Sequence, residues 1–243
     1  MPLENRDDWE KRLKRDLLRL IGPQADKLIR LLGNPPDINN VPESFWENLG
    51  DAEAEVIQSV LAAIYVESAQ QTLLNVPKSL RIDWRVANKP AADWAESYTF
   101  HLVSQINKTS RERLRRYVSD FFRIEGTTVA DLRGQISELF GPTRAEIIAT
   151  TEVTRAAAQG DIGIINEIEQ ANPKIQMVPY WDTSMDELVC PVCGNGLQGV
   201  QGWMVGGQPF FRSRDGRTYG APPDPHPRCR CGLRWEVRSK GRR

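Results

Sequence analysis

Residues 143–181 read TRAEIIATTEVTRAAAQGDIGIINEIEQANPKIQMVPYW, and the change of pattern inside this stretch decides the fold class. Up to Gln170, apolar residues and alanines recur at helical spacing, which predicts a long helix that approaches a partner closely. After Asn172-Pro173, which stops a helix, the sequence alternates and is rich in β-formers, so a strand is predicted there. The chain should therefore be helical before this point and β-rich after it.

The residues before 143 also show helical periodicity. An amphipathic segment that includes Trp9 should end at Pro23, because proline lacks a backbone N–H. Another helix is predicted over residues 51–74. Thr109 and Thr128 are each followed three residues later by an acid, as in a capping box, so each should begin a new helix.

After residue 181 the pattern is that of a small, loop-rich module. Residues 194–225 contain eight glycines and few aliphatic side chains, which predicts loop with short strands. LRWEV at 233–237 alternates again and is a candidate closing strand. The predicted fold is α+β and mostly α, with an N-terminal helical bundle and a β-rich, loop-rich zinc-binding module. The predicted domains are an N-terminal helical region (1–90), a second helical part (91–173), the module (174–238) and a basic tail (239–243).

Charge and hydropathy narrow the class of protein. Lys plus Arg equals Asp plus Glu at 32 each, so net charge does not indicate a polyanionic partner. Ten basic residues and three acids lie between Arg212 and Arg243, so the C-terminal end is a basic tail. Such a tail could bind phosphate or an acidic protein surface, or it could simply keep the protein soluble. No apolar run approaches the roughly 20 residues that span a bilayer, and the charged N-terminus has no signal-peptide core. A reducing cytoplasm, where thiols favour metal binding over disulfides, is expected.

All four cysteines lie in the last 54 residues, in two hooks. The first is Cys190-Pro191-Val192-Cys193, and the second is His226-Pro227-Arg228-Cys229-Arg230-Cys231, 32 residues later. Each hook has two ligand-type residues three apart, with a proline that stiffens the turn after the first. Structural Zn²⁺ takes four such ligands in a tetrahedron, and a small glycine-rich module needs a staple of this kind. We therefore predict a structural zinc.

Five candidate ligands compete for four positions. The preferred set is Cys190, Cys193, His226 and Cys229, because the second hook then matches the first, and Cys231 could replace either His226 or Cys229. Reduced thiols packed as small apolar groups and a redox dithiol remain alternatives. A catalytic zinc would need an open position and a general base, whereas acids beside a hook are usually surface residues.

Three sequence segments, in the order in which they occur along the chain, resemble the Mu F-like phage head morphogenesis (minor head) proteins. They are RAEIIATTE from Arg144 to Glu152, WDTSMDELVCPVCGNGLQG from Trp181, and PPDPHPRCRC ending at Cys231. In that family an arginine and a Thr-Glu pair on a helix precede W-x-T-x-x-D-x-x-V-C-x-x-C, a glycine-rich spacer and P-P-x-x-H-P-x-C-R-C. The resemblance covers about residues 90–237 and is strongest from Arg144 onward. It implies a polar motif cluster of Arg144, Thr151, Glu152 and Asp186.

The resemblance implies a structural minor capsid protein rather than an enzyme. It implies association with the phage portal protein and procapsid components, contact with packaged DNA, and no membrane or small-molecule substrate. The expected location is the bacterial host cytoplasm during assembly and then the virion head. Many members continue into a toxin-like or nuclease-like domain, and this sequence resembles the short form without one.

Other interpretations stay open at this point. A zinc-containing nucleic-acid-binding protein or nuclease is the alternative, although the sequence has two histidines and no acids spaced for two-metal chemistry. Arg144 and Glu152 could also belong to an exposed ion-pair ladder with Arg155. Trp181 and Trp203 are expected to pack around the hooks. The basic residues that would contact nucleic acid or a partner are Arg228, Arg230, Arg234, Arg238 and Lys240.

Overall fold

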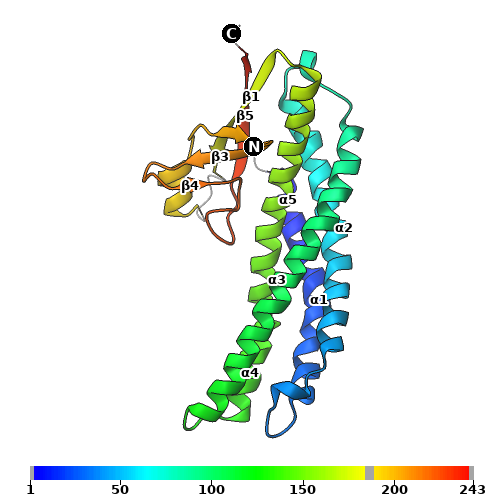
Figure 1. Cartoon of the computed structure of the whole chain (residues 1–243), viewed down its shortest axis with the longest axis vertical. Coiled ribbons are helices and arrows are strands. Elements are labelled where there is room, and N and C mark those ends of the chain that lie inside the picture. Colours follow the sequence, from blue (N-terminus) through cyan, green and yellow to red (C-terminus); the bar gives the residue numbers. More distant parts are fainter. Residues whose placement is uncertain (1–2, 184–188, 241–243) are drawn as a thin grey trace. The chain divides into compact units, whose positions relative to one another are not determined.

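The computed structural model describes residues 3–183 and 189–240 (Figure 1). The helices are α1 (Arg6–Leu32), α2 (Glu43–Asn75), α3 (Asn88–Arg123), α4 (Val129–Leu139) and α5 (Pro142–Ala171), with short 3-10 turns at Ile38–Asn40, Lys78–Leu80 and Trp84–Ala87. The strands are β1 (Ile175–Asp182), β2 (Trp203–Val205), β3 (Gln208–Arg212), β4 (Thr218–Tyr219) and β5 (Gly232–Ser239), and a π-helical segment covers Val192–Leu197. The mostly helical α+β class predicted from the sequence is confirmed. None of the helices in these described ranges combines the length and the apolar character that crossing a membrane requires.

The chain divides into two compact units. The sheet unit comprises Met1–Glu10, Val60–Trp94 and Ile148–Arg243, and the helical unit comprises Lys11–Ser59 and Ala95–Ile147. The boundaries fall inside α1, α2, α3 and α5, so each unit is assembled from stretches that are distant in the sequence.

Within the helical unit, Pro23 does not end α1. The helix continues to Leu32, so the predicted stop is wrong. The buried stripe of Leu17 and Ile21 continues with Leu28 beyond the proline, and this burial outweighs the lost backbone hydrogen bond. The Gln24 side chain also donates to the Leu20 carbonyl oxygen at 3.3 Å.

The two predicted capping boxes have different outcomes. Thr128 caps α4 as predicted, because its hydroxyl accepts from Asp131 N and the Asp131 carboxylate accepts from Thr128 N. Thr109 lies inside the continuous α3, so the predicted helix start there is wrong. No proline or glycine interrupts that region, and Ser110 Oγ donates back to the Ile106 carbonyl at 2.7 Å without breaking the helix.

In the sheet unit, two glycines of α5 allow α2 to approach closely. A Cβ at Gly160 would lie 2.2 Å from the carbonyl oxygen of Tyr65, and one at Gly163 would lie 1.8 Å from the Tyr65 hydroxyl. Ile164 and Ile168 continue the contact into a buried cluster that also holds Tyr65. The close approach of α5 to another helix is confirmed. The residues that permit it here are glycines, whereas the prediction was based on alanines.

The strands gather beside the C-terminal half of α5 (Figure 1). β1 pairs with β5 in antiparallel register from Ile175↔Ser239 to Asp182↔Gly232, and β2, β3 and β4 form a second antiparallel sheet. Both strands predicted at 175–181 and 233–237 are therefore confirmed. The register places the end of β1 next to the start of β5, so the chain that leads to the first hook and the chain that leaves the second meet at one end of the ladder.

Candidate metal centre

The first hook is a tight turn that begins at Cys190 and leads into the π-helical segment. The Cys193 backbone N–H donates to Cys190 Sγ at 3.4 Å, and the Gly194 N–H donates to the Cys190 carbonyl oxygen at 2.9 Å. Pro191 has a φ of −57°, which matches its fixed ring geometry. The backbone thus holds the two thiols of this hook on the same side of the turn.

The second hook is held by its own backbone and by α5. His226 Nδ1 lies 2.7 Å from the Pro227 carbonyl oxygen, and a proton on Nδ1 leaves Nε2 free to bind a metal. Arg228 has a φ of 63°, in the left-handed region that a non-glycine residue rarely adopts. Its backbone N–H donates to Thr151 Oγ1 at 3.0 Å, which stabilises this turn between His226 and Cys229.

The two hooks bring five metal-ligand side chains together. The Cys193 sulfur lies 3.5 Å from His226 Nε2 and 3.8 Å from the Cys229 sulfur. Tetrahedral zinc, with bonds of about 2.3 Å to sulfur and about 2.0 Å to nitrogen, separates its ligand atoms by about 3.5–3.8 Å. The Cys190 sulfur lies at a hydrogen-bond distance of 2.9 Å from His226 Nε2. The two distances from the Cys193 sulfur match this spacing, whereas the one between Cys190 and His226 is shorter, so the cluster could hold a metal ion after a small adjustment of its side chains.

Cys193 is the shared member of the cluster. It belongs to one group with Cys190 and His226 and to another with Cys229 and Cys231. The predicted ligands Cys190, Cys193, His226 and Cys229 thus all lie in one place, and the alternate ligand lies there too. The donor geometry supports a metal-binding cluster and leaves open whether Cys229 or Cys231 completes the set.

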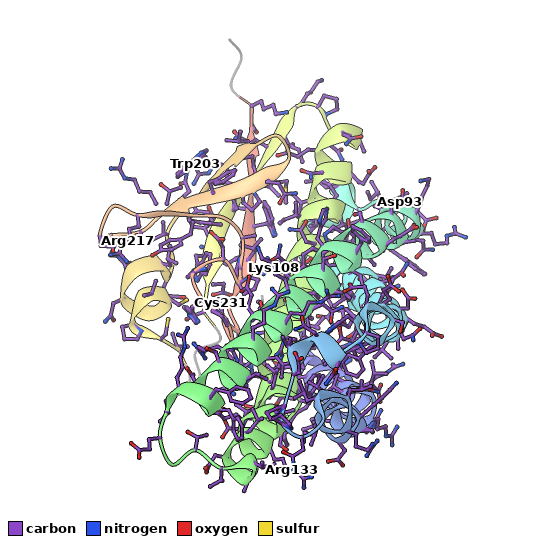
Figure 2. The ribbon with its side chains drawn as sticks, turned by 60° about the horizontal axis from the view of Figure 1, so that its bottom comes forward. Asp93, Lys108, Arg133, Trp203, Arg217 and Cys231 are labelled. Atoms are coloured by element: carbon purple, nitrogen blue, oxygen red, sulfur yellow. The ribbon has the colours of Figure 1, made fainter. Side chains whose placement is uncertain are left out.

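An apolar shell encloses the thiols. Trp181 is 1% exposed, packs in the same buried cluster as Cys193 and meets Phe211 edge-on at 5.3 Å. Trp203 is instead 43% exposed on the outer surface of β2 and stacks on Phe210, so the prediction that it shields the hooks is wrong. Figure 2 labels Cys231, next to the start of β5, and Trp203 on β2.

Burial changes the chemistry of the thiols. Hydrogen bonds with Cys229 and Cys231, together with burial, raise the pKa of the Cys193 thiol well above its ordinary range. Loss of the Cys193 proton is thus disfavoured without a cation, and a divalent cation would bind by displacing that proton.

Two side chains of α5 contact the backbone of the second hook. Besides the contact from Thr151 to Arg228, the Thr154 hydroxyl lies 2.6 Å from the Cys229 carbonyl oxygen. Glu152 is 4% exposed and pairs with Arg155 Nε at 3.3 Å. The ion pair with Arg155 therefore exists, but Glu152 is buried rather than part of an exposed ladder.

Arg144 lies in the helical unit and makes its own network there. Its guanidinium donates to Ser110 Oγ at 2.8 Å and to the carbonyl oxygens of Ile106 and Leu139. It also lies near the buried Glu53. Burial raises the pKa of Glu53, the positive charge of Arg144 partly opposes this rise, and the net result is a pKa of about 7. Asp186, the remaining residue of the predicted polar cluster, lies outside the described residues.

The basic residues predicted to contact nucleic acid differ in their surroundings. Arg230 is held by Asp7 and Glu10. Arg234 pairs with Glu236 and lies over the ring of Tyr180, which also accepts a hydrogen bond from Arg238. The side chain of Arg228 and that of Lys240 are exposed.

Three residues of the first helical turn contact the second hook, although no sequence pattern indicated them. They are Arg6, Asp7 and Glu10, which lie 220 or more positions from Arg230. No local spacing could have identified them, because the contact depends on the folded path of the chain. No family model, curated protein or solved structure matches this chain.

Proposed function

We propose that this chain is a structural phage head morphogenesis protein of the minor capsid type, which binds the portal or procapsid, and that its cluster holds a structural zinc. The observation that carries the proposal is the convergence of the three motif blocks. Thr151 from the first block accepts a hydrogen bond from Arg228 of the third, and Cys193 from the second lies beside Cys229 of the third. Motifs that meet in space support one shared structural role.

The donor set favours zinc over other cations. Thiolates and an imidazole suit zinc, whereas calcium and magnesium prefer oxygen ligands. Cys190, Cys193, His226 and Cys229 would fill all four positions, with Cys231 as the alternate ligand. A filled tetrahedron has no open position for substrate, which supports a structural role rather than a catalytic one. When bound, zinc would cross-link the two hooks with an apparent binding energy of about 10–16 kcal/mol.

Elemental analysis of the purified, undenatured protein tests the zinc centre. We expect one equivalent of zinc per chain, removed by a strong chelator with a rise in hydrogen exchange across the two hooks. Less than a third of an equivalent, with the module still ordered, would refute the zinc centre.

Assembly assays test the role in the phage head. Procapsids formed by the portal and major capsid proteins of the same genome, with and without this chain, should differ in composition after sedimentation. We expect the chain to co-sediment with procapsids that contain portal. Its absence from both procapsids and virions would refute the role in morphogenesis.

The alternative makes opposite predictions. A nuclease would degrade DNA or RNA in the presence of added Mg²⁺, and a DNA-binding module would bind duplex DNA with steep salt dependence. Removing the residues after Val237 would then abolish binding. Either outcome without procapsid association would favour the alternative.

A further inference from the structure

We propose that residues 3–10 form a strap over the second hook, and that docking of this strap and binding of metal reinforce each other. This inference rests on the metal centre of the proposed function. It adds a regulatory element that is distant from the motif blocks in sequence, and all of its contacts lie within the sheet unit.

Arg6 is the central contact of the strap. Its side chain is buried, and the residue is 5% exposed. Nη1 donates to the carbonyl oxygen of Arg230, and Nη2 donates to Thr154 Oγ1 at 2.6 Å. That threonine also contacts the carbonyl oxygen of Cys229. One buried guanidinium thus holds the carbonyl of Arg230 directly and that of Cys229 through Thr154, which are the two peptide groups between the candidate ligands Cys229 and Cys231.

The hook in turn holds the strap. The guanidinium of Arg230 bonds the carboxylate of Asp7 and lies 3.2 Å from Glu10 Oε1, and its side chain is 19% exposed. The two contacts run in opposite directions, from strap to hook and from hook to strap. Strap and hook therefore each supply an arginine that the other binds.

The strap also contacts α5, where the Thr150 hydroxyl donates to Glu10 at 3.4 Å, and α2. Leu3 is 5% exposed, the Glu4 N–H donates to Gln71 Oε1 at 3.1 Å, and Glu67 accepts from Asn5 and from Trp9 Nε1. Such partly exposed hydrogen bonds contribute little individually. We therefore expect the strap to depend on the hook for most of its order.

Electrostatics couples the strap to the metal more directly. A zinc held by three thiolates and a neutral histidine carries a net charge of about −1. Burial lowers the pKa of Arg6 and the nearby Arg230 lowers it further, whereas Glu10, Cys229 and Cys231 oppose both effects. A negative metal centre compensates for burying this cation, whereas neutral thiols do not. By thermodynamic reciprocity, a strap that docks better on the loaded centre must also tighten metal binding.

The test compares Arg6→Gln with Arg19→Gln, an exposed arginine of the same helix. Zinc affinity is measured by competition with a chromophoric chelator, and hydrogen exchange of residues 3–10 is measured with and without zinc. We expect Arg6→Gln to weaken zinc binding by about 10- to 100-fold, as for other residues that orient metal ligands. Arg19→Gln should change it less than about twofold. Removing zinc from the wild type should speed exchange in the strap by about tenfold or more.

Asp7→Asn provides a second variant in case Arg6→Gln does not fold. Its side chain is 69% exposed, and it removes one partner of Arg230, so zinc binding should weaken by about two- to fivefold. Unchanged zinc affinity in both variants, or strap exchange that is independent of zinc, would overturn the strap alone. A wild type that binds no zinc would overturn the zinc centre and the strap together.

Discussion

Replacing Cys193 by serine should weaken zinc binding far more than replacing Cys231. Cys193 belongs to both three-donor groups, so its loss leaves two donors in each. Loss of Cys231 leaves Cys190, Cys193, His226 and Cys229 complete. A structural zinc contributes about 10–16 kcal/mol of apparent binding energy, or about 2.5–4 kcal/mol per ligand. At 1.4 kcal/mol per factor of ten, Cys193→Ser should reduce affinity by about 60- to 700-fold.

The assay for this prediction uses both variants in parallel. Cobalt substitution reports thiolate coordination by its visible absorption, chelator competition gives the affinity, and limited proteolysis maps which residues lose protection. We expect Cys193→Ser to expose the two hooks while fragments of the helical unit stay protected, and Cys231→Ser to bind within about tenfold of wild type. Equal losses in the two variants would contradict the assignment of Cys231 as the alternate ligand. A proteolysis pattern identical to that of the wild type in Cys193→Ser would contradict the metal as the staple of the module.

Three further predictions concern stability, each measured by denaturant unfolding. Gly160→Ala should lower the unfolding free energy by about 2 kcal/mol or more, because its Cβ would lie 2.2 Å from the Tyr65 carbonyl oxygen. Gly134 is exposed within α4, and a Cβ there would have no atom within 4 Å. Gly134→Ala should therefore raise the unfolding free energy by about 0.5–1 kcal/mol. The pKa of Glu53 rises from 4.5 to about 7, so the folded state holds the extra proton and stability falls as pH increases between these values. Glu53→Gln should remove that fall and stabilise the protein at pH 8 by up to about 3 kcal/mol, with little effect at pH 4, and a parallel pH profile in both proteins would contradict this. Thr128→Ala should cost about 1 kcal/mol through loss of the α4 cap, and no loss would contradict its role.

Features set by local pattern could be predicted from the sequence. The period of two in residues 175–181 and 233–237 marks strands that pair in one ladder. The two proline-stiffened hooks indicate metal ligands, and the structure brings them together because the ladder aligns their chain segments. In these cases the physical cause acts within a few residues, so the sequence displays it.

Features set by tertiary competition could not be predicted. Pro23 carries a stop signal that the buried stripe of α1 overrides, and Thr109 carries a start signal inside a helix that nothing interrupts. A tryptophan such as Trp203 would be expected to pack against the core of a small module, yet the alternation of side chains along β2 places it on the outer surface. The contact of Arg6 with the hook depends on the whole path of the chain. Local sequence shows what each residue favours, but not which preference prevails.

The contact between Arg6 and Arg230 also has a consequence for synthesis. Its partners are 224 positions apart, so the ribosome releases the first long before it makes the second. At roughly 5–20 residues per second, about 11–45 s separate them. During that interval Arg6 lacks its carbonyl partner on Arg230, and between the synthesis of Cys193 and that of His226 the nascent chain has both thiols of the first hook but no ligand of the second. The metal-bound form can therefore be completed only after the second hook has been translated, which makes residues 3–10 among the last of the sheet unit to reach their final contacts.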